Sequence, residues 1–186
     1  MSECVGCSLD QVTKDTLKEF PKFRVVPKSE SFTMKAINVF LIAVSFGRMK
    51  SFMTGFATTL GTTVYVTPGW PTKPDADKAV LLRHERVHMR QARRLTRPLF
   101  SLLYLLLFLP GGLAWFRARF EMEAYEETIR ATFEHYGRTA VFDKGFRDRI
   151  AKNFTGPAYL YMWPFPKTVD KWILDAVERI AGKETP

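Results

Sequence analysis

The residues best suited to chemistry stand together in the segment His84-Glu85-Arg86-Val87-His88. In an α-helix, side chains four positions apart lie one above the other, so His84 and His88 can direct two imidazoles at one metal ion. Glu85 lies one step further around the helix, where its carboxylate can meet a metal-bound water instead of the metal. This spacing predicts a Zn2+ (zinc) site with His84 and His88 as ligands and Glu85 as the general base.

The chemistry that follows from this pattern is hydrolysis of a peptide bond. Zinc lowers the pKa of a bound water towards neutrality, and the carboxylate can take the proton that this water releases. The resulting hydroxide attacks a carbonyl that the same ion polarises, and Glu85 then passes the proton to the leaving amine. The alternative is a solvated helix that matches the motif by accident, because short motifs recur by chance.

A catalytic zinc site needs a third protein ligand and an open position. The third histidine of the chain, His135, is one candidate. The other is an acidic residue in the segment of residues 117–125, where both Glu121 and Glu123 occur. These two glutamates differ by about 200° around a helix, so only one of them can face the metal.

An HExxH motif followed by a second helix with the pattern E-x-x-A, from Glu121 to Ala124, resembles the gluzincin-type metallopeptidases, including small single-domain ones. The resemblance covers roughly residues 56–130. It implies that Glu121 is the third ligand and that Ala124 lets the two helices pack closely, with Glu123 as the alternative ligand. It also implies that an edge strand before the motif helix holds the substrate backbone by strand addition. Gln91 recurs in some of these families as well.

Many members of these families supply a tyrosine or histidine that stabilises the oxyanion. No spacing selects one residue for this role here, and a buried structural aromatic is the more common fate of a tyrosine. The candidates are His135, Tyr125, Tyr159 and Tyr161.

The elements that must position the motif can be read from the periodicity of the chain. Apolar residues and the two histidines recur at helical spacing from Val80 to Gln91, so the motif lies on a helix. Before it, residues 56–66 are rich in Thr and Val and are interrupted by Gly61, which predicts a hairpin. A short strand is expected at residues 23–26, and a helix capped by Ser29 or Ser31 and ended by Gly47.

Further helices are expected after the motif. One runs from about Leu113 to Tyr136, with Gly137 as its stop, and amphipathic helices follow at residues 143–154 and 169–180. The sequence therefore predicts a mostly helical α+β fold, zincin-like, with a small antiparallel sheet before the motif helix and a second, Glu-bearing helix. A flexible tail is expected over residues 1–20 and a single domain over residues 21–186.

Residues 98–116 carry no charge and have arginines at both ends, which alone would indicate a membrane span. However, Pro110-Gly111-Gly112 interrupts the run. A straight crossing would also place His88 and Glu121 about 30 Å apart, on opposite sides of a bilayer. The zinc site therefore requires this run to fold back as an apolar helical hairpin. Such a hairpin either packs under the active-site helices or dips into a membrane surface.

The bulk composition narrows the remaining possibilities. The net charge of +9 favours anionic partners without choosing among nucleic acid, acidic lipid and acidic substrate, and no specific nucleic acid is predicted. Cys4 and Cys7 are the only cysteines, too few to complete a four-ligand zinc site. They are interpreted as part of the tail, with a redox or metal role as the alternative. No disulfide framework is indicated, so a cytoplasmic location is expected, with membrane association left open.

The function predicted from the sequence is that of a zinc-dependent metallopeptidase acting on a protein or peptide substrate, with peripheral membrane contact through residues 98–116 left open. Two alternatives remain. One is a non-catalytic binding or structural protein that keeps a zincin-like fold. The other is a membrane-associated basic protein in which the HExxH motif is fortuitous.

Overall fold

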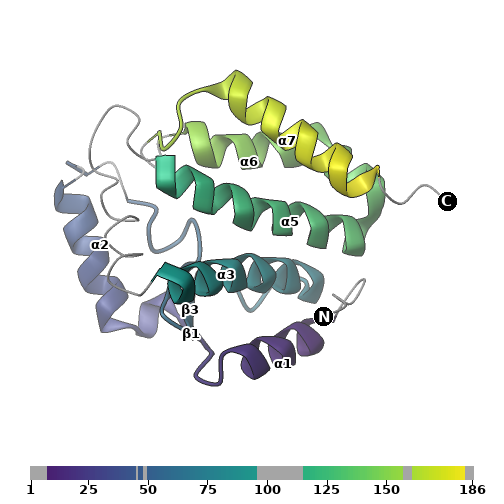
Figure 1. Cartoon of the computed structure of the whole chain (residues 1–186). Coiled ribbons are helices and arrows are strands. Elements are labelled where there is room, and N and C mark those ends of the chain that lie inside the picture. The colour runs from purple at the N-terminus through teal and green to yellow at the C-terminus, as the bar shows by residue number, and fades with distance from the viewer. Residues whose placement is uncertain (1–7, 45, 48–49, 96–114, 157–160, 183–186) are drawn as a thin grey trace. The chain divides into compact units, whose positions relative to one another are not determined.

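The computed structural model describes residues 8–44, 46–47, 50–95, 115–156 and 161–182. These residues are mostly helical and include one small sheet (Figure 1), so the predicted α+β class is confirmed. They divide into two compact units, residues 8–89 and residues from 90 onward. The boundary between the units falls inside the continuous helix α3 (Asp75–Leu95).

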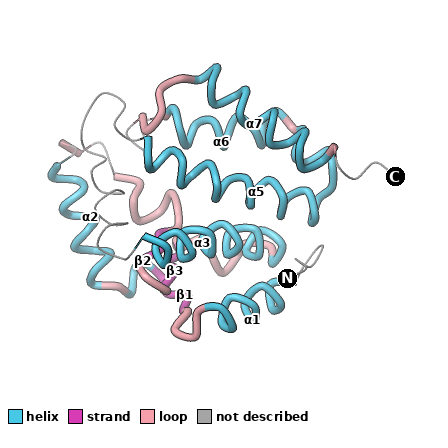
Figure 2. The backbone as a smooth tube through the Cα atoms, in the orientation of Figure 1, coloured by secondary structure: helices cyan, strands magenta, loops and turns pink. Residues whose placement is uncertain are grey.

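The N-terminal unit contains the sheet, which Figure 2 shows in magenta. Its strands are β1 (Arg24–Pro27), β2 (Thr58–Leu60) and β3 (Thr63–Val66), in the order β1-β3-β2. The hairpin of β2 and β3 is antiparallel, as predicted, and Gly61 between the two strands has a φ of 63°. β1 pairs with β3 in parallel, so the sheet is mixed and the prediction of an antiparallel sheet is wrong.

Helix α1 (Leu9–Glu19) occupies most of the segment that the sequence analysis assigned to a flexible tail. The Ser8 side chain accepts a hydrogen bond from the backbone N–H of Gln11, which caps the first turn. Val12 and Thr16 form a buried face four residues apart on this helix, and Phe20 is buried just after its end. The segment is polar overall, and these residues are its buried part.

Helix α2 (Phe32–Val44) begins after a short 3-10 turn, η1 (Lys28–Glu30), that follows β1. The Ser31 hydroxyl accepts a hydrogen bond from the backbone N–H of Met34, which confirms Ser31 as one of the two expected caps. After the helix, Gly47 has a φ of 79° and donates its N–H to the carbonyl of Ile42, which closes the helix end as expected.

The C-terminal unit is built from the end of α3 and three helices, α5 (Trp115–Phe142), α6 (Lys144–Thr155) and α7 (Pro166–Ala181). The last two match the amphipathic helices expected from the sequence. Gly137 interrupts α5 with a φ of 77°, but helical residues continue to Phe142, so it produces a kink rather than the predicted stop. The side chain of Asp143 caps α6 by accepting the N–H of Phe146 at 2.7 Å.

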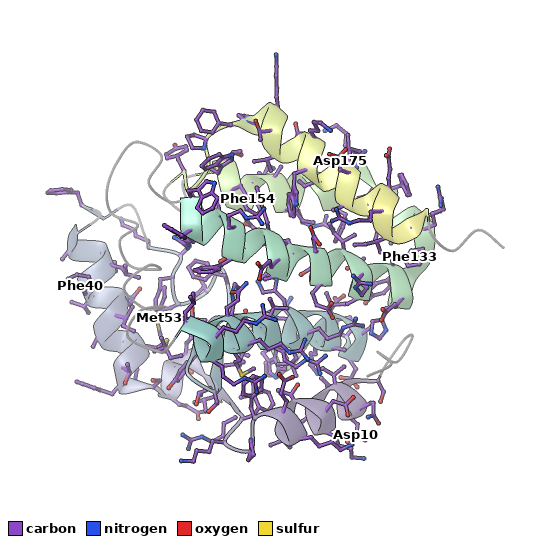
Figure 3. The ribbon with its side chains drawn as sticks, viewed as in Figure 1. Asp10, Phe40, Met53, Phe133, Phe154 and Asp175 are labelled. Atoms are coloured by element: carbon purple, nitrogen blue, oxygen red, sulfur yellow. The ribbon has the colours of Figure 1, made fainter. Side chains whose placement is uncertain are left out.

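The core of this unit lies where α5, α6 and α7 pack on one another. Phe154 of α6, labelled in Figure 3, is fully buried there. Its ring lies 5.5 Å from the ring of Tyr125 on α5 and 5.5 Å from that of Trp172 on α7, measured between centroids. The Phe154 side chain thus joins α6 to both α5 and α7.

The apolar run of residues 98–116 lies almost entirely outside the described residues, and so does the predicted hairpin. Cys4, Cys7 and Tyr159 are outside them as well. Within the parts of the chain that the structure describes, no helix is both long enough and apolar enough to cross a membrane.

Replacing Phe154 by Ala should lower the free energy of unfolding by about 3–5 kcal/mol, because it removes a buried ring and leaves a cavity among three helices. Urea denaturation followed by circular dichroism measures this change. The matched control is Phe165→Ala, since that ring is half exposed, and it should cost less than about 1 kcal/mol. Equal losses in the two variants would contradict the placement of Phe154 at the centre of the unit.

Candidate metal centre

Helix α3 carries the HExxH motif, as the periodicity predicted, and its charges suit its ends. Asp75 and Asp77 lie in the first turn and Arg93 and Arg94 in the last, where they complement the helix dipole. The motif falls in the middle of the helix, where all its neighbours have regular hydrogen bonds along the backbone. Its side chains therefore project from a rigid element.

The Nε2 atoms of His84 and His88 lie 3.2 Å apart. His84 is half-buried and His88 is buried. Two nitrogens bound to one tetrahedral zinc ion at about 2.0–2.1 Å stand about 3.3 Å from each other. The spacing of the two rings thus fits two ligands of a single ion.

Glu85 is buried beside the sheet of its own unit, and its carboxylate is held in place. The Thr59 hydroxyl, on strand β2, donates a hydrogen bond of 2.7 Å to Oε2 of Glu85. The HExxH motif itself gives no indication of this partner. The hydroxyl fixes the orientation of the carboxylate that the sequence assigned to the general base.

Lys28 is a fully buried cation in the same unit. Its Nζ donates to the carbonyl oxygens of Phe52, at 2.5 Å, and Phe56, at 2.8 Å, and lies over both phenyl rings, 3.9 and 4.6 Å from their centroids. Burial lowers the pKa of Lys28 to about 8, and the negative charge of Glu85 opposes part of that shift. Lys28 thus ties η1 to the segment that leads into β2 and places a positive charge within electrostatic reach of Glu85.

Gln91 lies one turn beyond His88 on α3 and is buried. Its side-chain amide donates to the backbone carbonyl of Phe120 at 3.0 Å and to Oε2 of Glu123 at 2.9 Å, both on α5. These two bonds hold the end of the motif helix against the part of α5 that contains Glu121. They also occupy the carboxylate of Glu123, which is exposed to solvent.

Glu121 is buried on α5, with 2% of its surface exposed. Among the described residues, His84, His88 and Glu121 form a group in which one ligand atom from each side chain lies within 4.8 Å of the other two. Glu123 and His135 are not part of this group. His135 lies about 21 Å further along α5 than Glu121, because fourteen residues of helix separate them.

The candidates for oxyanion stabilisation have different surroundings. Tyr125 is buried against Phe154, and its hydroxyl accepts a hydrogen bond of 2.6 Å from the Asn153 amide, so it belongs to the core of the C-terminal unit. Tyr161 is more than half exposed, with a φ of 53°. The oxyanion partner stays unassigned.

Sequence reasoning missed two of the residues that support the motif. Thr59 looked like one of several strand-forming threonines, and Lys28 like an ordinary surface lysine. Thr59 supports the motif because its hydroxyl on β2 reaches the Glu85 carboxylate on α3. Lys28 lies in the interior because its ammonium packs over the rings of Phe52 and Phe56. Phe52 and Phe56 lie far from Lys28 in the sequence, so no local signal indicated its burial.

Comparisons with known proteins add no further assignment. No protein-family model, no curated protein and no solved structure matches the chain. The function must therefore be argued from the side chains of the site.

The buried ammonium of Lys28 predicts a characteristic pH dependence of stability. Its pKa is about 8 in the folded chain, against an ordinary value of 10.5 once the chain unfolds. Between these two values the unfolded chain binds more protons than the folded chain, so the free energy of unfolding rises with pH across this window. On going from neutral pH to pH 10.5, the wild type should therefore gain stability relative to Lys28→Met.

Urea denaturation of both proteins at a series of pH values measures this difference. Lys35→Met is the control, because Lys35 is exposed and its removal should leave the pH dependence of the wild type unchanged. Parallel pH curves for the wild type and Lys28→Met would contradict the burial of a titrating ammonium at this position.

Proposed function

We propose that the protein is a zinc-dependent metallopeptidase of the gluzincin type, in which His84, His88 and Glu121 hold the ion. The observation that carries this proposal is the grouping of two imidazole nitrogens 3.2 Å apart with a buried carboxylate, all within 4.8 Å. Two histidines and one carboxylate form a donor set that suits zinc and leaves its fourth position open. An open position is typical of catalytic sites, whereas structural zinc sites are closed by four protein ligands.

The chemistry proposed at this site is hydrolysis of a peptide bond. A bound zinc ion would lower the pKa of a water molecule and polarise the carbonyl to be attacked. Glu85 has the role of general base: its carboxylate accepts a proton from the attacking water and later gives it to the leaving amine. The hydrogen bond from Thr59 supports this role, because a carboxylate that must meet a water in one direction needs a fixed orientation.

The substrate is proposed to be a protein or peptide, and the fold is proposed to be zincin-like. The order of elements supports this: a small sheet precedes α3, and the glutamate that would complete the site lies on the later helix α5. β2 is an edge strand of the sheet, and its Thr59 is bonded to Glu85. An extended peptide that paired with this strand would run close to the general base.

Metal analysis of the purified protein tests the proposal. The wild type should bind one zinc ion per chain, and His84→Ala or Glu121→Ala should each weaken zinc affinity by more than about 100-fold, because each removes a ligand. The matched control His135→Ala removes a histidine outside the group and should retain the metal, whereas Glu123→Ala removes only a partner of Gln91 and should weaken zinc affinity less than Glu121→Ala does. Zinc loss in Glu123→Ala but not in Glu121→Ala would show that the third ligand is misassigned. A wild type unable to bind zinc would refute the proposal.

Catalysis is tested separately with Glu85→Gln, which keeps the size of the side chain and removes the base. This variant should keep its zinc and lose about 10²–10⁴-fold in the rate of cleavage of a fluorogenic peptide library. Asp77→Asn is the control, because it removes a carboxylate from the first turn of the same helix and should leave the rate unchanged. Undiminished cleavage by zinc-loaded Glu85→Gln would rule out Glu85 as the base.

A further inference from the structure

Helix α2 exposes a row of large apolar side chains. The exposed fractions are 84% for Phe32, 67% for Val39 and 56% for Phe40, which Figure 3 labels on this helix. Ala36 and Ala43 are also exposed. Positions 32, 36, 39, 40 and 43 share one face of a helix, so these side chains form a continuous stripe.

The other side of α2 is apolar as well, with Met34 and Leu41 buried against the N-terminal unit. A helix with apolar residues all round is normally buried on every side or in contact with lipid. Exposed apolar residues that occur singly need no explanation, but a stripe of phenylalanine and valine on one helix indicates a surface that is covered in use.

The end of α2 extends this stripe. Phe46 is 94% exposed and has a φ of 51°, an unusual conformation for a bulky residue. Its N–H donates to the carbonyl of Ala43, and the next N–H, of Gly47, donates to that of Ile42. These two bonds close the helix in a way that holds the Phe46 ring out in solvent, beyond the last turn.

The charge of α2 and of the segment that follows it has a single sign, and Glu30, exposed just before α2, is the nearest acidic residue in the sequence. Residues 31–74 contain no aspartate and no glutamate, and their charged residues are Lys35, Arg48, Lys50 and Lys73. Lys35 lies on α2 and Lys50 shortly after it, and both are exposed. An apolar stripe with basic residues beside it is typical of helices that lie in the interface of an anionic membrane.

We propose that α2 is a docking surface for an anionic lipid bilayer. Phe32, Phe40 and Phe46 enter the boundary between headgroups and acyl chains, and Lys35 and Lys50 contact the headgroups. Charge complementarity favours lipid over a second copy of the chain. In a two-fold dimer the same face meets itself, so the lysines of one copy would approach those of the other, and Glu30 is the single acidic residue of the segment 28–74.

Vesicle sedimentation with the full-length protein tests this proposal. The protein should bind vesicles that contain phosphatidylserine more tightly than vesicles of phosphatidylcholine alone, and added salt should weaken the binding. Phe40→Glu should weaken binding to phosphatidylserine vesicles by about tenfold or more, since a charge replaces a ring that inserts. Leu17→Glu, on α1, is the control: it places the same charge at another exposed apolar position and should bind as the wild type does.

A second variant tests the electrostatic part without altering an apolar residue. Lys35→Glu combined with Lys50→Glu should remove the preference for phosphatidylserine, a loss of about tenfold or more. Both positions are exposed, so this variant also provides the test if Phe40→Glu does not fold, which a thermal melt will show.

Two results would overturn the proposal. One is vesicle binding that neither Phe40→Glu nor the double lysine variant changes, since the lipid would then contact another part of the chain. The other is absence of vesicle binding together with a dimer, seen by light scattering, that Phe40→Glu dissociates. That outcome would identify the stripe as a contact between two copies. Neither measurement depends on zinc or on cleavage.

Discussion

Two hydrogen bonds from one amide join the end of the motif helix to α5. Gln91 donates to the carbonyl of Phe120 and to the carboxylate of Glu123, so the end of the motif helix is fixed against one turn of α5. His88 lies about 4.5 Å before Gln91 along the helix axis, and Glu121 directly follows Phe120 in the chain. The proposed ligands come from segments far apart in sequence, and Gln91 and Phe120 adjoin them along the chain.

A second set of contacts supports Glu85, the proposed base. Lys28 joins the turn after β1 to the carbonyls of Phe52 and Phe56, and β2 begins shortly after Phe56. A buried ammonium costs free energy unless its donors are used, and here two carbonyls and two ring faces offset that cost. The strand that this arrangement fixes carries Thr59, whose hydroxyl holds Glu85. The position of Glu85, the proposed base, thus depends on a lysine far from it in sequence.

The sequence was informative wherever a local rule decides the structure. The spacing of His84 and His88, Gly61 between two β-prone segments and the cap at Ser31 each follow from short-range geometry, and each corresponds to an observed feature. It failed where tertiary contacts decide. The parallel pairing of β1 and the burial of Lys28 both depend on partners distant in the chain. A resemblance to known families, rather than periodicity, separated Glu121 from Glu123.

The hydrogen bond between Thr59 and Glu85 connects strand β2 to the motif helix α3. Thr59 belongs to β2, an edge strand that pairs only with β3 among the described strands. Because the same hydroxyl belongs to this strand and orients Glu85, a segment that paired with the edge would act on the carboxylate through Thr59.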